Sequence, residues 1–118
     1  MLNSIWKTLL GCILLFTVIS SAEASFHTFK VNEIYSNADG SIQFIELREA
    51  SGLNGQNIWA GHTLTSSNGT TTNTFTFSSN LPSSTTANRM VLVATQAFAN
   101  LGIVQPDYII PAGFLFPD

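Results

Sequence analysis

Two glutamates, Glu33 and Glu46, are the side chains of this sequence whose spacing could do chemistry. They lie in two segments rich in branched and aromatic residues, 29–35 and 42–48, and an Asp-Gly dipeptide stands between the segments at 39–40. This pattern is typical of a β-hairpin. If the dipeptide forms the turn, the two glutamates lie directly opposite each other, with their Cβ atoms about 4.5–5.5 Å apart.

Two carboxylates at this separation are open to three interpretations. Both could have a structural role, in hydrogen bonds to loop backbone or in an ion pair with Arg48. Both could bind a hard cation such as Ca²⁺, and this is the metal site that we predict, at Glu33 and Glu46. Both could act as the acid pair of a retaining glycosidase. Catalysis is the least favoured, because so short a chain offers no deep cleft for a sugar.

Other chemistry has little support in the sequence. His27 and His62 are far apart, and no cysteine follows Cys12 to complete a zinc site. The sequence contains no Gly-x-Ser-x-Gly elbow and no phosphate-binding glycine loop. We therefore predict no enzymatic activity. Trp59, if it is exposed, could stack on a sugar ring, and it is then the best single binding candidate.

The first 24 residues carry the pattern of an export signal. An apolar run of eleven residues covers 9–19, and the small residues Ala22 and Ala24 follow at the positions that a signal peptidase reads. Eleven helical residues span only about half of a hydrocarbon core about 30 Å thick, so a permanent membrane helix is disfavoured. We predict cleavage after Ala24 and a secreted or periplasmic product. Lipidation of Cys12, within Leu-Leu-Gly-Cys, is the alternative.

The remaining part, 25–118, is predicted to be one domain. It has no cysteine and therefore no disulfide, and its 94 residues suffice for a single core. Three basic and six acidic residues give it a net charge of −3. Three scattered cations cannot form the basic surface that nucleic-acid binding needs, so nucleic acid is not an expected partner.

The pattern of the rest of the chain indicates an all-β fold. If 39–40 is the turn, Tyr35 faces Phe44 and Lys30 faces Glu49 across the first hairpin. The apolar, non-alternating run 89–95 is typical of a central strand. Further expected elements are strands at 58–65 and 70–77, a polar loop at 78–88, a helical turn at 96–101 and an edge strand at 108–111. The apolar ending 112–118 suggests a last strand or two that another chain, or a longer reading frame, supplies.

The order of these segments resembles the lamin-tail-like domain, an immunoglobulin-like β-sandwich of many secreted bacterial proteins. The matching pieces cover most of 29–95: Val31-Asn32-Glu33-Ile34, Phe44-Ile45-Glu46-Leu47, Ile58-x-x-Gly61-x-x-Leu64, Phe75-Thr76-Phe77, Leu81-Pro82 and Met90-Val91-Leu92-Val93-Ala94. Trp59 departs from the family pattern, in which the tryptophan follows the glycine. The resemblance implies an antiparallel sandwich used as an accessory or binding module, without common catalytic residues.

Three functions remain open. The first is an exported, non-enzymatic binding or structural module whose partner is a protein or polysaccharide at the cell exterior. The second is an accessory piece of an extracellular hydrolase or nuclease. The third is a Ca²⁺-dependent adhesion module that uses Glu33 and Glu46.

Overall fold

The structure is a computed structural model that describes residues 26–117. The predicted export signal, its cleavage site and Cys12 lie outside these residues. The elements are β1 (Phe29–Ser36), β2 (Gln43–Glu49), β3 (Thr63–Ser67), β4 (Thr72–Thr76), β5 (Met90–Thr95), α2 (Gln96–Ala99) and β6 (Tyr108–Ile110). The strands form a four-stranded sheet of order β1-β2-β5-β6 and a two-stranded sheet, β3-β4. For residues 26–117, the prediction of an all-β fold is confirmed.

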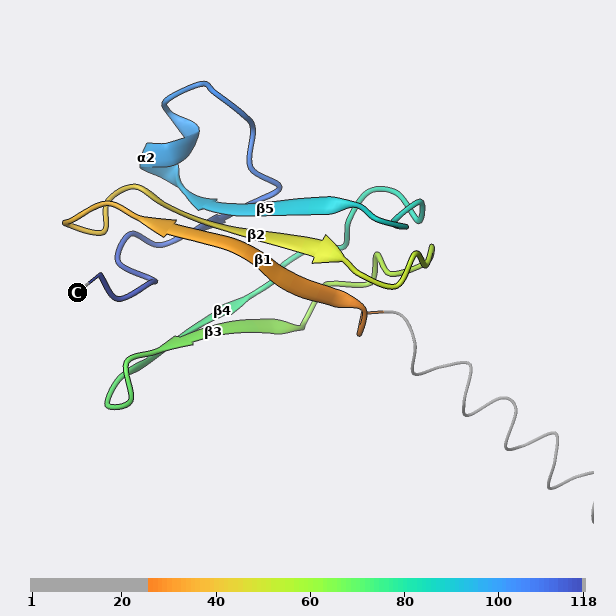
Figure 1. The fold of residues 1–118 in the computed structure, drawn as a ribbon, viewed down its shortest axis with the longest axis horizontal. Helices are drawn as coiled ribbons and strands as arrows, with labels where there is room; N and C mark the ends of the chain where they lie inside the picture. Colours follow the sequence, from red (N-terminus) through yellow and green to blue (C-terminus); the bar gives the residue numbers. More distant parts are fainter. Residues whose placement is uncertain (1–25, 118) are drawn as a thin grey trace, which may run out of the picture.

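The two sheets face each other, and α2 lies on the opposite side of the larger sheet (Figure 1). We call the face of the four-stranded sheet toward β3–β4 its core face and the other its outer face. Alternation along β2 assigns its side chains to these faces. Gln43, Ile45, Leu47 and Glu49 are buried on the core face, and Phe44, Glu46 and Arg48 point outward.

The register of the first hairpin is confirmed near the turn and wrong at the other end. Tyr35 pairs with Phe44 and Glu33 with Glu46, as predicted, but Lys30 pairs with Arg48. A β-bulge between Val31 and Glu33 is the cause, because one extra residue in β1 shifts by one the partners of residues 29–31, which lie beyond the bulge from the turn.

The hairpin turn is a six-residue loop, 37–42, in place of the expected two-residue turn. It keeps the predicted register because the Asn37 N–H donates to the Ile42 carbonyl, at 3.0 Å. Gly40 has φ +76°, a conformation that suits glycine. The hydroxyl and then the backbone N–H of Ser41 donate to the Asp39 carboxylate and lower the pKa of Asp39.

The second hairpin begins later than predicted. Its first strand, β3, starts at Thr63, so the expected strand 58–65 is wrong over its first half. The amide oxygen of Asn80 accepts the backbone N–H groups of Trp59 and Ala60, both at 2.9 Å. These two backbone donors are therefore satisfied by a side chain, and the segment folds as a loop.

The predicted central strand, helical turn and edge strand are confirmed. β5 lies between β2 and β6, and its Val91, Val93 and Ala94 are fully buried. The Thr95 hydroxyl caps the single turn of α2. β6, however, runs parallel to β5, so the prediction of a wholly antiparallel fold is wrong for this pair. The connection 96–107 crosses the outer face and returns the chain to the starting end of β5, as a parallel pair requires.

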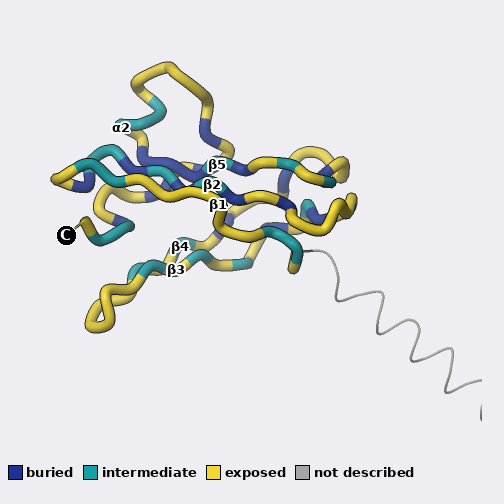
Figure 2. The backbone as a smooth tube through the Cα atoms, viewed as in Figure 1, coloured by how far each residue is buried: buried dark blue, intermediate teal, exposed yellow. Residues whose placement is uncertain are grey.

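The core lies between the two sheets (Figure 2). Strands β2, β5 and β6 contribute aliphatic side chains, and the loops contribute large aromatic ones. The buried cluster consists of Ile45, Leu47, Trp59, Phe77, Leu81, Val91, Val93, Tyr108, Ile110 and Phe114. Because Phe114 is only 3% exposed, this part of the apolar ending packs within its own domain.

Candidate functional site

The two glutamates that the sequence singles out lie opposite each other on the outer face. The amide of Asn32, the bulged residue, donates to Glu46 Oε1 at 2.8 Å. The side chain of Glu33 is exposed and forms no hydrogen bond or ion pair within the part of the chain that the structure describes. Arg48 forms no ion pair with either carboxylate among those residues, so the proposed structural pairing with Arg48 is not observed.

The glutamate pair would provide only part of a calcium site. Ca²⁺ takes six to eight oxygen ligands. Within residues 26–117, no group of three or more His, Cys, Asp or Glu side chains could hold a metal ion. Any Ca²⁺ at Glu33 and Glu46 would therefore need ligands from water or from a bound partner.

An apolar groove lies beside Glu46 on the same outer face. Strands β2 and β5 form its floor, and α2 and the connection 96–107 form its wall. The lining residues are Phe44, Glu46, Met90, Leu92, Phe98, Val104, Gln105 and Asp107.

The volume of this outer groove is about 310 Å³, which is near the lower limit for pockets that hold a small ligand. A separate groove of about 410 Å³ lies beside β1 on the core face and is lined in part by Ile34, Ser66 and Phe116.

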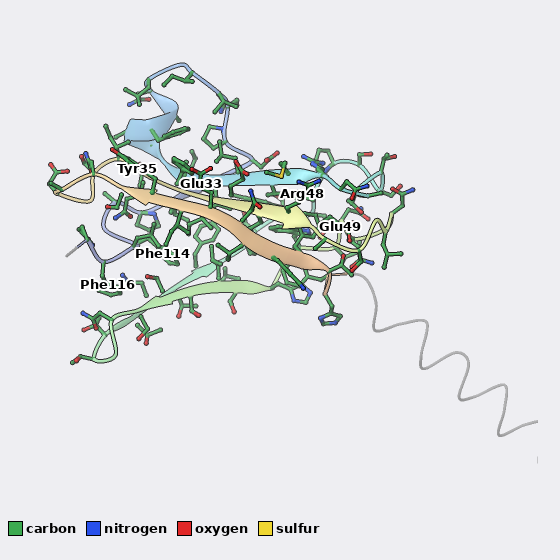
Figure 3. All side chains as sticks on the ribbon, viewed as in Figure 1. Glu33, Tyr35, Arg48, Glu49, Phe114 and Phe116 are labelled. Carbon is green, nitrogen blue, oxygen red and sulfur yellow. The ribbon has the colours of Figure 1, made fainter. Side chains whose placement is uncertain are left out.

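Three aromatic rings form a row at one end of the outer groove. The rings of Tyr35 and Phe44 stack with their centroids 5.6 Å apart and an interplanar angle of 16°. Phe98 of α2 follows, with its centroid 5.5 Å from that of Phe44. In Figure 3, Glu33 and Tyr35 lie on the side of β1 toward α2, whereas Phe114 and Phe116 lie on the side toward β3–β4. The outer face therefore combines an aromatic row with two facing carboxylates.

The far end of the outer groove is held in place by Asp107. Its Oδ1 accepts from Arg89 at 3.0 Å, and its Oδ2 accepts from the backbone N–H of Leu92 at 2.9 Å. Arg89 thus pairs with Asp107, whereas Glu33 and Glu46 form no ion pair among the described residues.

Sequence reasoning missed the groove wall. Phe98 and Val104 belong to the connection 96–107, which was expected to be a helical turn followed by an unassigned stretch. A signal was present, because Leu101, Ile103 and Val104 are apolar residues in a loop, and they are 52%, 77% and 50% exposed. Exposed apolar side chains gathered in one loop indicate an interaction surface.

The structure rules out Trp59 as a binding residue. Its side chain is 0% exposed, so it cannot stack on a ligand. Its ring contacts those of Phe29, Phe77 and Tyr108 at centroid distances of 4.9, 4.8 and 5.6 Å. Its indole N–H donates to the Gln56 carbonyl at 2.9 Å. Because the chain at 58–61 is a loop that folds over the core, the indole points inward.

A third glutamate, Glu49, is buried and was not predicted to matter. Its carboxylate accepts the backbone N–H groups of Ser51, Leu53 and Asn88 at 2.9–3.1 Å. Burial alone would raise the pKa of Glu49, but these hydrogen bonds and the nearby hydroxyl of Thr28 favour the charged form and lower the pKa to about 2. Glu49 therefore ties the loops 50–53 and 86–89 to the end of β2, which is a structural role.

The histidines are separated in the structure. His62 stacks on Phe26, with ring centroids 4.1 Å apart, and His27 is exposed. The described residues contain no helix that is long and apolar enough to cross a membrane.

Comparisons with known proteins do not assign a family. No family model matches the chain, and no curated protein or solved structure matches it. The lamin-tail-like identity and the immunoglobulin-like topology therefore stay predictions.

Proposed function

We propose that this chain is an exported, non-enzymatic binding module and that its outer face takes a segment of a partner protein at the cell exterior. The observation that carries the proposal is the apolar groove between β2, β5 and the connection 96–107, with Glu46 in its lining. Grooves of this kind, mostly apolar with a few polar groups, are the usual form of a binding site.

The chemistry of the face favours a protein segment over a polysaccharide. A sugar ring stacks on an exposed aromatic face, but Trp59 is buried, and Tyr35, which is 47% exposed, is not among the residues that line the groove. The groove instead offers Leu92, Phe98 and other apolar side chains to an apolar anchor. Glu46 lines the groove and Glu33 faces Glu46 across the strands, and since neither forms an ion pair among the described residues, both can pair with a cation of the ligand. The ligand that fits is an apolar residue followed by a lysine or arginine.

The test is an NMR titration of the isotope-labelled protein with defined probes. The probes are short peptides in which leucine or phenylalanine precedes lysine, matched peptides with glutamate in place of lysine, and cello- and chito-oligosaccharides. We expect saturable shifts of the Leu92 and Val104 amides with the lysine peptides, and weaker shifts with the glutamate peptides. Selective shifts of these amides with an oligosaccharide would replace the protein ligand by a polysaccharide.

A matched pair of variants separates groove binding from binding elsewhere. Val104→Asn places a polar group in the groove, whereas Ile58→Asn makes the same change at a loop residue outside it; the two side chains are 50% and 43% exposed. We expect Val104→Asn to weaken binding about tenfold, which corresponds to about 1.4 kcal/mol, and Ile58→Asn to leave it unchanged. Equal binding by both variants, or no shift with any probe, would overturn the proposal.

A Ca²⁺-dependent adhesion module is the second candidate. The specific observation in its favour is that Glu33 and Glu46 pair across the strands, with Glu33 free of a partner among the described residues. A cation held there would also alter the charge of the groove beside it.

A further inference from the structure

Strand β1 is an open edge of the larger sheet. β2 is its neighbour on one side, and no described strand pairs with its other side. An edge strand of eight residues presents unpaired N–H and C=O groups to which another strand can bind. Two of its apolar side chains are left uncovered on the core face, since Val31 is 58% and Ile34 is 60% exposed.

The β-bulge gives β1 a symmetric pattern of side-chain directions. Pairing with β2 places Phe29, Val31, Ile34 and Ser36 on the core face. Lys30 and Glu33 pair with outward-pointing residues, Tyr35 pairs with Phe44, and Asn32 reaches the outward-pointing Glu46. Read from either end of β1, the side chains point to the core face, the outer face, the core face, the outer face twice, the core face, the outer face and the core face.

We propose that β1 pairs antiparallel with β1 of a second copy of this chain, about a two-fold axis between Asn32 and Glu33. The symmetric pattern allows every residue of β1 to lie opposite a residue on the same face. Val31 then lies opposite Ile34 of the second copy, and Lys30 lies opposite Tyr35 of the second copy. The two bulges meet at the axis, so the distortion of one strand is matched by the same distortion in the other.

Charge and shape support this partner. Neither Lys30 nor Glu33 forms an ion pair within residues 26–117. In the proposed register they become diagonal neighbours across the new pair, a position that long side chains can bridge. On the core face, a groove of about 410 Å³ beside Ile34 is lined also by Ser66, Leu115 and Phe116. Val31 of the second copy, opposite Ile34, points toward this groove.

The first test is the oligomeric state of the purified chain by analytical ultracentrifugation over a concentration series. We expect a reversible dimer, and Ile34→Lys should weaken it at least tenfold because it places two charges in the apolar part of the interface. Ile103→Lys is the matched control, since Ile103 is 77% exposed in the connection 96–107, on the opposite face of the sheet from Ile34, and it should dimerise like the parent. Circular dichroism establishes that each variant is folded.

A charge exchange tests the predicted ion pair. Lys30→Glu and Glu33→Lys should each weaken the dimer, because each brings like charges together, and the double variant should restore it. Restoration is not expected if these residues act only within their own chain. A monomer at every concentration, or equal association by Ile34→Lys and the parent, would overturn the proposal.

Disulfide cross-linking tests the register. In a Cys12→Ser background, chains with Val31→Cys and chains with Ile34→Cys are mixed and oxidised. The two cysteines would face each other with Cβ atoms about 4.5–5.5 Å apart, close enough to cross-link after a small adjustment. We expect the mixture to form covalent dimers and each variant alone to form few. Equal cross-linking in all three samples would exclude this register.

Discussion

Replacement of Trp59 by alanine should strongly destabilise this domain. The side chain is fully buried, and its ring meets four other aromatic rings, those of Phe26, Phe29, Phe77 and Tyr108. A buried tryptophan-to-alanine change costs about 3–5 kcal/mol. A domain of this size has a total stability of about 5–14 kcal/mol, at about 0.05–0.15 kcal/mol per residue. The substitution therefore removes a large share of the total.

The assay is urea unfolding followed by far-ultraviolet circular dichroism, with thermal melting as a second measurement. At about 4–8 °C per kcal/mol for a domain of this size, Trp59→Ala should lower Tm by more than about 12 °C. Trp59→Phe keeps a ring but loses the hydrogen bond to Gln56, so we expect an intermediate loss. Ile103→Ala is the exposed control and should change stability by less than about 0.5 kcal/mol. A Trp59→Ala variant as stable as the parent would refute the assignment of Trp59 to the core.

Three further predictions concern the buried carboxylate of Glu49, the buried amide of Gln43 and the glutamate pair on the outer face. The pKa of Glu49 is about 2 in the folded state and about 4.5 unfolded, so its charged form stabilises the fold above pH 4.5 and this contribution is lost as the pH falls toward 2. Glu49→Gln should therefore flatten the acid side of a plot of Tm against pH, and an unchanged slope would contradict this. Gln43 is fully buried, donates to the Leu115 carbonyl at 2.8 Å and accepts the Leu115 N–H at 3.0 Å. Gln43→Ala should cost about 1–3 kcal/mol in urea unfolding and speed hydrogen exchange at Leu115, whereas slow exchange there would show that other contacts hold the segment. If Glu33 and Glu46 bind Ca²⁺, Tm should rise with Ca²⁺ and fall with chelator, and the double change to glutamine should abolish the rise; equal shifts in variant and parent would dispose of the site.

Local patterns in the sequence predicted much of the larger sheet. Alternation and the Asp-Gly dipeptide were enough to place Glu33 opposite Glu46, because hairpin pairing depends on residues close in the chain. The same local information did not reveal the bulge at Asn32. At the bulge, Asn32 points outward and donates a hydrogen bond to Glu46 of the neighbouring strand. This contact forms only when the two strands are paired, so the sequence around Asn32 does not specify it.

The proposed binding site was only half predictable. Its carboxylates follow from strand register, but its wall follows from the path of the connection 96–107, which crosses the sheet because β6 pairs parallel to β5. That choice depends on β5 and β6 meeting in space. No pattern within 96–107 specifies it.

The sequence by itself determined the all-β character, the first hairpin and the central position of 89–95, since side-chain alternation and continuous apolar runs are local properties. Tertiary structure alone decided that Trp59 is buried, that Glu49 is a buried carboxylate, and that an apolar groove lies next to Glu46. Each of these depends on which distant segments cover a side chain. Burial is a property of the packed chain, and a residue's type and near neighbours do not set it.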